Sequence, residues 1–473
     1  MPTMAEPRVV PRAEHPISRQ NIDPDALKVL YRLRQFNYTA YLVGGSVRDL
    51  LIGRRPKDFD IGTSAHPYQV KKLFRNCWII GRRFRLAHVR FGPKVIEVAT
   101  FRRQVTLGEE MGPGHDERDL DHAANPAEPT TEPNTAGVLR EESSTDHFIH
   151  RDNTFGTPEE DAFRRDFTIN ALFYDIATFS IIDYVGGLDD LRAGVVRSIG
   201  DPEVRFREDP VRMMRAVALA ARLDFTIDQP ILDAIRVHRH EIARSSPPRV
   251  LEEYYKILRA GSAERTFRDL ARLGLLEPVT TELHHGAAEP LWRSLAALDA
   301  HRRRFDSTPE ILTNALLLGT LLVPLGLHSS AGRREDLRCS HDRTTPLVEE
   351  EADPRDLQGR FEHRAAGPRL GELPLARRDI ERLRQMLALQ RRLHDLGVSP
   401  RAKRALVHRS PFREALAWLE IHGGRPDLVE HWKAFVSDAG PMSDATGGDG
   451  RDAARTLWRR KRRRRRRFRP TPQ

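Results

Sequence analysis

Two aspartates that flank one phenylalanine, Asp58 and Asp60, are the residues of this sequence best placed to do chemistry. The stretch Asp58–Ile61 predicts a short strand, and side chains alternate across a strand, so both carboxylates share one face. A divalent cation would relieve their repulsion, and Mg²⁺ is typically held by one or two carboxylates plus substrate phosphates. The alternative interpretation is a pair of solvated aspartates on an edge strand.

A pair of glycines precedes the aspartates. Tyr41–Val43 predicts a strand, Gly44 and Gly45 a tight turn, and Ser46 the N-cap of a helix over Val47–Ile52. Helix N-termini present unpaired N–H groups that suit phosphate, and glycine lets the backbone approach an anion closely. This order of elements predicts a phosphate-binding turn.

Arg48 falls in the first turn of that helix, where it could reach the same phosphate, with Asp49 as a pairing partner. An ordinary glycine turn explains the glycine pair when it is taken alone. The two carboxylates that follow favour a nucleoside triphosphate held between backbone amides and a metal ion.

Three segments resemble one family in the order in which they occur. They are LVGGSVRDLLIGRRPKDFDIGTSA (Leu42–Ala65), RRDFTINALFYD (Arg164–Asp175) and DPEVRFREDPVRMMRAVALAARLDF (Asp201–Phe225). Together they resemble the nucleotidyltransferases that comprise bacterial poly(A) polymerases and tRNA CCA-adding enzymes, over roughly residues 25–270. The resemblance implies an α+β fold, with a polymerase-beta-like α/β head followed by an all-α neck and body. It also implies nucleotide transfer to an RNA 3′ end.

That reaction is attack of an RNA 3′-hydroxyl on the α-phosphate of a nucleotide, for which two metal ions near Asp58 and Asp60 are expected. Two residues compete as the third carboxylate. Glu97 interrupts an apolar strand, and Asp166 lies in a segment that the family keeps near its active site. We favour Asp166, for which the alternative is a structural salt bridge to Arg165 or a helix cap.

The choice of base is predicted to rest on Asp209 and Arg212. Pro210 at a first helical position makes Asp209 the expected N-cap, and residues three apart share a helix face. An aspartate can accept from an exocyclic amino group while an arginine donates to the adjacent ring nitrogen, a pattern that adenine and cytosine share. The segment also resembles the amino-acid template of the family. The alternative is a cap plus a surface ion pair.

By resemblance, Arg165 and Asn170 help to place the sugar and triphosphate. Arg215 is a weaker candidate for the same task, and Lys256 matches a further family motif but is as readily structural. The predicted nucleotide-binding residues are therefore Gly44, Gly45, Arg48, Arg165, Asn170, Asp209 and Arg212.

Length, charge and cysteine content indicate the kind of partner and the compartment. The chain has 473 residues, a net charge of +11 and two cysteines. This favours an anionic partner such as RNA, excludes a disulfide framework and fits a reducing cytoplasm. The most apolar run, Ile311–Leu327, contains Asn314 and Pro324 and predicts a buried helix rather than a membrane span.

Shifts in composition predict five regions. They are a disordered N-terminus over 1–24, a catalytic head over 25–200 with a disordered loop at 108–146, a helical neck for nucleotide and RNA over 201–275, a helical body over 276–440 with a polar insertion at 329–371, and a disordered basic RNA-binding tail over 441–473.

Two features favour one branch of the family. Ile80–Val89 resembles the poly(A) polymerase form of that segment, and the arginine run Arg455–Arg469 would bind phosphate backbones without sequence preference. We expect template-independent addition of AMP from ATP to RNA 3′ ends, with Mg²⁺, which would mark RNAs for decay. The alternatives are a CCA-adding enzyme and a non-catalytic RNA-binding protein on the same scaffold.

Overall fold

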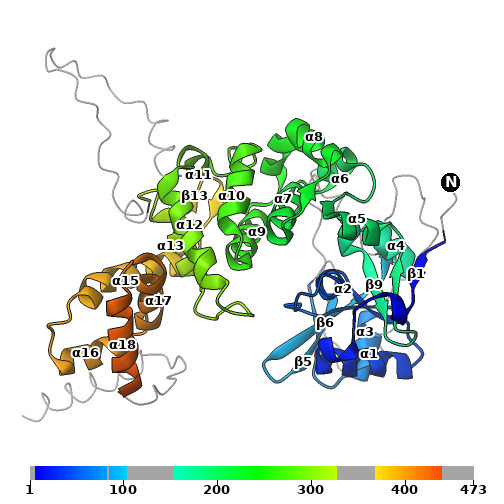
Figure 1. Cartoon of the computed structure of the whole chain (residues 1–473), viewed down its shortest axis with the longest axis horizontal. Helices are drawn as coiled ribbons and strands as arrows, with labels where there is room; N and C mark the ends of the chain where they lie inside the picture. The colour runs from blue at the N-terminus through cyan, green and yellow to red at the C-terminus, as the bar shows by residue number, and fades with distance from the viewer. Residues whose placement is uncertain (1–5, 82–84, 104–153, 328–367, 439–473) are drawn as a thin grey trace, which may run out of the picture. The chain divides into compact units, whose positions relative to one another are not determined.

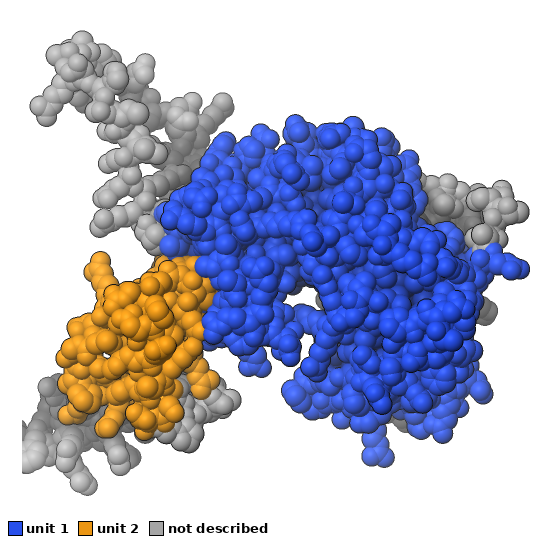
Figure 2. All heavy atoms as spheres, in the orientation of Figure 1, with its two compact units in different colours: residues 1–380 blue, residues 381–473 orange. Residues whose placement is uncertain are grey.

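The chain forms two compact units, residues 1–380 and 381–473 (Figure 2). The computed structural model describes residues 6–81, 85–103, 154–327 and 368–438. The predicted loop at 108–146, the tail at 441–473 and most of the insertion at 329–371 lie outside these residues. So do the arginines of the Ile80–Val89 segment at positions 82 and 83.

The head, drawn in blue to cyan in Figure 1, is built on one mixed sheet. This sheet has eight strands in the spatial order β1-β10-β9-β2-β3-β6-β5-β4. Its strands are β1 (Arg8–Val10), β2 (Ala40–Val43), β3 (Asp60–Thr63), β4 (Cys77–Ile80), β5 (Leu86–Phe91), β6 (Lys94–Thr100), β9 (Leu172–Asp175) and β10 (Ser180–Asp183). Neighbouring strands are antiparallel except β3 and β6, which are parallel. The apolar strand predicted around Glu97 is confirmed as β6.

Strands β4, β5 and β6 bury the side chains of one face of the sheet and leave those of the other face accessible. Alternation along β6 buries Ile96 and Val98, while Val95 and Glu97 point the other way. Helices α1 (Pro24–Gln35) and α3 (Pro67–Leu73) pack against the sheet. The carboxylate of Glu97 is thereby left on the face away from this core.

The prediction of a disordered N-terminus over residues 1–24 is wrong for most of this segment. Residues 6–24 are folded rather than disordered, because β1 pairs with β10 at the edge of the sheet. Val10, Ile17 and Ile22 are buried and anchor the segment. The Pro- and Arg-rich composition hid these few apolar anchors.

The rest of the first unit is mainly helical, as predicted. Its principal helices are α6 (Pro202–Glu208), α7 (Val211–Leu223), α8 (Gln229–His238), α9 (Pro247–Ala260), α10 (Ala263–Arg272), α12 (Glu289–Arg302) and α13 (Asn314–Leu322). Nearly every residue of α13 is buried, which confirms a buried helix in the most apolar run. In the described ranges no helix is both long and apolar enough to cross a membrane.

The predicted insertion at 329–371 ends earlier than expected. Residues Arg369–Leu370 (β13) and Leu373–Pro374 (β14) form a hairpin, and Gly371 in its turn has a φ of +56°. A Cβ at Gly371 would meet the carbonyl oxygen of Val279 at 2.2 Å, so only glycine fits this close approach.

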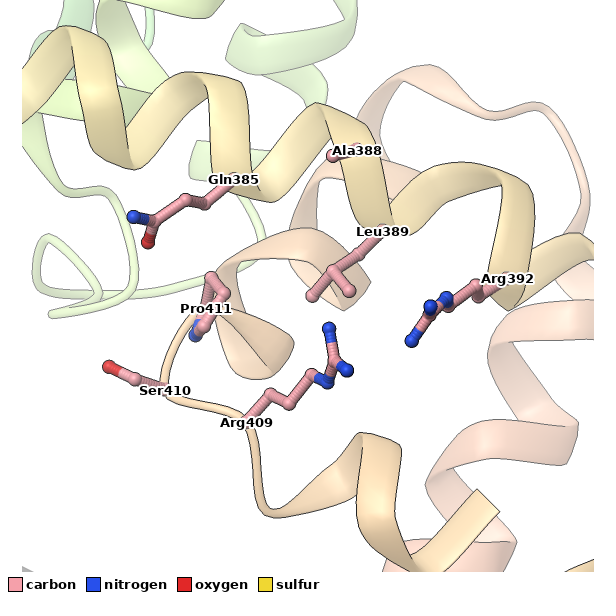
Figure 3. A pocket seen from close by; sticks show the side chains of 7 residues that line it. All are labelled: Gln385, Ala388, Leu389, Arg392, Arg409, Ser410 and Pro411. Atoms are coloured by element: carbon pink, nitrogen blue, oxygen red, sulfur yellow. The ribbon is translucent and has the colours of Figure 1, made fainter. Parts of the chain in front are cut away.

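The second unit holds most of α15 (Arg377–His394) with α16 (Pro400–Val407), α17 (Phe412–His422) and α18 (Pro426–Asp438). Its core is centred on Trp432, which is fully buried and whose Nε1 donates to the carbonyl oxygen of Leu393 at 2.9 Å. A cavity of about 440 Å³ opens beside α15 (Figure 3). It is lined by Gln385, Ala388, Leu389, Arg392, Arg409, Ser410 and Pro411.

Candidate active site

The carboxylate pair lies where the chain enters β3. The strand begins at Asp60, so the prediction that it starts at Asp58 is wrong by two residues. Asp58 lies in the preceding loop with a side chain that is 71% exposed, 3.7 Å from the ammonium of Lys57. A strand that begins later leaves one carboxylate fixed by the sheet and the other on a loop.

Glu97 is the acidic neighbour of this pair. In the parallel pairing of β3 and β6, Ile61 lies opposite Val98, which puts Asp60 beside Glu97 on the same face. Water reaches Asp60, yet the surrounding protein desolvates it. That desolvation and the charges of Glu97 and Asp58 raise the pKa of Asp60 to about 6. Desolvation and Asp58 likewise raise the pKa of Glu97.

Asp166 has different surroundings. Its Oδ1 accepts from the backbone N–H of Phe167 at 3.0 Å, and its Oδ2 lies 3.9 Å from a guanidinium nitrogen of Arg215. The side-chain amide of Asn170 also donates to Oδ1 of Asp166 at 3.5 Å, whereas the carboxylates whose charges act on Asp60 are Glu97 and Asp58. These contacts favour Glu97 as the third carboxylate and leave the role predicted for Asp166 untested.

The glycine turn has the geometry that a close backbone approach requires. Gly44 has a φ of +71° and caps the N-terminus of α2 (Gly45–Leu51). A Cβ there would lie 3.0 Å from Nη1 of Arg165. Ser46 is not the N-cap, because it lies inside α2 and its hydroxyl donates to the carbonyl oxygen of Val43 at 2.9 Å.

The predicted triphosphate residues converge beside this turn. Arg48 is almost fully buried and donates to Asp49 at 2.7 Å and to the side-chain oxygen of Asn170. Arg165 donates from Nη1 to the backbone carbonyl of Asn170 at 3.1 Å. The structure therefore brings Gly44, Arg48, Arg165 and Asn170 together, although they are up to 126 positions apart (170 minus 44).

A buried acid that sequence reasoning missed holds this arginine cluster. Asp161, in α4 (Pro158–Phe163), accepts from Arg164 at 3.0 Å and from Arg165 at 2.9 Å. Burial by itself would raise the pKa of Asp161, but the charges of Arg165 and Arg164 outweigh it and lower that pKa. Asp161 stays ionised and fixes the direction of Arg165. The spacing of four residues between Asp161 and Arg165 on a helix was the sequence signal that could have revealed this ion pair.

The predicted base-selecting pair lies between two helices. Asp209 follows α6, and Pro210 occupies the cap position of α7, so Asp209 is not the N-cap. The Oδ2 of Asp209 accepts from Arg249 at 2.8 Å, and its Oδ1 is buried without a hydrogen-bond partner. Arg212 donates to Glu208 at 3.1 Å and to the carbonyl oxygen of Arg205 at 3.2 Å. The buried free oxygen of Asp209 is an acceptor in need of a donor.

Two further arginines join the head to the helices. Buried Arg205 donates to the backbone carbonyls of Arg164 and Arg165. Arg215 donates to buried Glu253 at 3.1 Å, and Lys256 pairs with the same carboxylate at 2.9 Å. This ion pair fits the structural alternative for Lys256 and does not test the other one. Arg205 was missed by the sequence analysis although it lies within a quoted motif.

The acidic residues are suited to a metal ion that the substrate helps to hold. In the ranges that the structure describes, no three Asp, Glu, His or Cys side chains form a ready-made metal cluster. Desolvation and then the repulsion from Glu97 and Asp58 raise the pKa of Asp60, and a divalent cation relieves both. Mg²⁺ commonly completes its coordination with substrate phosphates and water, so two carboxylates suffice.

Three family models match the chain. Residues 40–197 match the poly A polymerase head domain, residues 224–286 the probable RNA and SrmB-binding site of polymerase A, and residues 357–469 the polymerase A arginine-rich C-terminus. Poly(A) polymerase I of Salmonella typhimurium is 48% identical over 271 residues, which cover 57% of this chain and 53% of that protein. The enzyme of the same name from Haemophilus influenzae is 40% identical over 270 residues, or 57% and 54%.

A CCA-adding enzyme from Lactobacillus helveticus is 34% identical over 232 residues, 49% of each chain. The matches thus span about half the length of these curated relatives. The crystal structure of the Bacillus stearothermophilus CCA-adding enzyme in complex with CTP shares the fold, with a TM-score of 0.54 and 24% identity over 88% of this chain and 83% of that one.

The head and its site define a nucleotidyltransferase. More narrowly, the chain belongs to the nucleotidyltransferase family that includes bacterial poly(A) polymerases and tRNA CCA-adding enzymes.

Proposed function

We propose that this protein is a template-independent poly(A) polymerase that adds AMP from ATP to RNA 3′ ends. The observation that carries the proposal is the acidic site of Asp60, Asp58 and Glu97 beside the Gly44 turn, in a head that matches poly A polymerases over 158 residues (40–197). Relatives named poly(A) polymerase I at 40–48% identity favour this branch over the CCA-adding one.

The chain's own residues divide the work. Arg48 and Arg165 hold the triphosphate, with directions set by Asp49 and Asp161, so that the α-phosphate lies over Asp60. Asp58 and Asp60 would hold Mg²⁺, with Glu97 as the third carboxylate, and the bound metal ion supplies charge stabilisation and an acidified hydroxyl. Asp166 and Asn170 position the sugar from the arginine side of the site.

Nucleotide choice rests on the unpartnered oxygen of Asp209. A buried carboxylate oxygen accepts hydrogen bonds only, so it favours a base that presents an amino group. Arg212 supplies the donor once it turns from Glu208 toward a base. Because cytosine offers the same edge as adenine, this pair excludes GTP and UTP and leaves ATP against CTP to other contacts.

The test is transfer by the purified chain with Mg²⁺, supplying each nucleotide separately, to a generic RNA and to a tRNA that lacks its 3′ end. We expect long tails from ATP on both RNAs. Addition that stops after C, C and A on tRNA alone would show the CCA-adding activity instead, and no transfer to either RNA would leave only RNA binding.

Two substitutions test the assigned roles. Arg212→Ala should raise the KM for ATP and lower discrimination against GTP by about a hundredfold, because an unfilled hydrogen bond in a selective site separates substrates strongly. Glu97→Gln should reduce kcat more than Asp166→Asn does. The opposite order would return Asp166 to the place of third carboxylate.

A further inference from the structure

A row of side chains runs from the acidic site to the edge of the sheet. In the antiparallel pairing, Glu97 of β6 lies opposite His88 of β5, and His88 lies opposite Trp78 of β4. Directly opposed residues share one face, which is also the face of Asp60. The order along this row is therefore Asp60, Glu97, His88 and Trp78.

The far end of the row is open to solvent. Trp78 is 52% exposed, although large aromatic side chains are usually well buried. His88 is partly exposed, with its Nε2 3.6 Å from Oε2 of Glu97. Ile80, two residues along the same edge strand, is 50% exposed, so the edge of the sheet presents an apolar platform next to an imidazole.

The geometry of the reaction indicates from which side the RNA 3′ end approaches Asp60. Gly44 directly follows β2, and Val43 at the end of β2 lies opposite Asp60, so the triphosphate turn is on the β2 side of Asp60. The attacking and leaving oxygens are roughly in line across the transferred phosphorus. With pyrophosphate leaving on the β2 side, the RNA 3′-hydroxyl arrives from the opposite side, over Glu97 and His88.

We propose that Trp78 and His88 form a platform that binds the 3′-terminal nucleotides of the RNA primer, with Trp78 stacking on a base. This inference rests on the proposed function. Strands lie about 4.8 Å apart, so Trp78 is roughly 14 Å across the sheet from Asp60. That is about the length of four stacked nucleotides at about 3.4 Å each. Stacking on an aromatic ring tolerates any base, which suits an enzyme that extends unrelated RNAs.

The experiment measures the KM for a short single-stranded RNA and the KM for ATP with Trp78→Ala, Trp78→Phe and the control Val95→Ala. Val95 is 46% exposed on the same face but lies opposite Arg90, outside the row. We expect Trp78→Ala to raise the KM for RNA about tenfold and to leave the KM for ATP within about twofold. Trp78→Phe should retain most of the affinity, and Val95→Ala should match the unchanged protein.

A second measurement does not depend on turnover. An RNA with 2-aminopurine placed in turn at each of the four 3′-terminal positions should lose fluorescence on binding to the unchanged protein at one position. Trp78→Ala should restore that fluorescence. An unchanged KM for RNA and unchanged quenching in Trp78→Ala would overturn the platform. A lowered melting temperature with an unchanged KM would overturn it too, and would show that another part of the chain covers Trp78. Absence of transfer by the unchanged protein would instead refute the proposed function.

Discussion

Arginines have different surroundings in the head and in the second compact unit. In the head, Arg48 and Arg165 are held by Asp49, Asp161 and Asn170 before any substrate binds. In the second unit, the guanidinium groups of Arg392 and Arg409 line one cavity, and within the described residues neither has an ion-pair or hydrogen-bond partner (Figure 3).

The difference fits what we propose that each region binds. A reacting phosphate must be held to within a fraction of an ångström, so arginines that hold it are best oriented in advance by neighbouring acids. A phosphate backbone of any sequence needs only positive charge, which acts through counterion release and tolerates loose geometry. We expect the first kind of arginine to control rate and the second to control RNA affinity.

The largest effect should come from the acidic site of the head. Asp60→Asn is expected to lower kcat at least about a thousandfold, because loss of a metal ligand removes several kcal/mol of transition-state stabilisation. The same change removes a charge that Glu97 and Asp58 repel, so the melting temperature should stay constant or rise. Steady-state kinetics and thermal unfolding measure the two effects.

The control for Asp60→Asn is Asp233→Asn, which removes an exposed carboxylate of α8 that pairs with Arg236. This change should alter neither rate nor melting temperature. Turnover by Asp60→Asn close to that of the control would remove Asp60 from the catalytic site.

The next largest effect is expected at Asp161, the buried acid that orients Arg165. Asp161→Asn should lower kcat/KM for ATP about tenfold to a hundredfold, because a charge-assisted hydrogen bond to Arg165 is worth about 1.5–3 kcal/mol. RNA affinity should not change. Rates are measured below the melting temperature of the variant, so that unfolding does not enter.

Asp189→Asn is the matched control, since Asp189 also binds two arginines, Arg8 and Arg192, but is 69% exposed. Exposed ion pairs contribute little, so its kcat/KM should stay within about twofold. Equal losses in both variants would show that the burial of Asp161 gives Arg165 no special direction.

The smallest effect is expected in the second unit. The double substitution Arg392→Ala with Arg409→Ala should weaken binding of single-stranded RNA several-fold at moderate salt and leave kcat unchanged. The slope of log affinity against log salt should become shallower by about 1.4, or about 0.7 for each phosphate that is no longer neutralised. Titrations of the full-length protein over a range of salt concentrations measure this.

Arg425→Ala is the control in the same unit, because Arg425 is already paired with Asp427 at 2.7 Å. Its salt slope should match that of the unchanged protein. If both variants show the same slope, RNA does not use the arginines of the cavity.

Local patterns fixed much of this architecture in advance. The apolar neighbours of Glu97 predicted the strand that is β6, and the apolar run predicted the buried helix α13, because apolar runs are a local property of the chain. The motifs placed Gly44 at a turn with positive φ and indicated Arg48, Arg165 and Asn170 as one site.

The ends of helices and strands, and the pairing of strands that are distant in the chain, depended on the tertiary structure. Whether the N-terminal residues fold depended on pairing with β10, a strand some 170 residues later, and no local pattern reports that. The start of β3 at Asp60 and the cap at Pro210 were each missed by one or two residues, since helix and strand ends depend on neighbouring elements.

The sequence by itself indicated the kind of chemistry, because the types and order of Gly44, Arg48, Asp58 and Asp60 predict a phosphate turn beside carboxylates. Only the tertiary structure shows which acids lie near Asp60. Strand pairing sets Glu97 next to Asp60, while Asp166 contacts Arg215, the side-chain amide of Asn170 and the backbone N–H of Phe167. The physical reason is that a carboxylate's role follows from the charges within a few ångströms of it. Those neighbours come from strands and helices that are far apart in the chain.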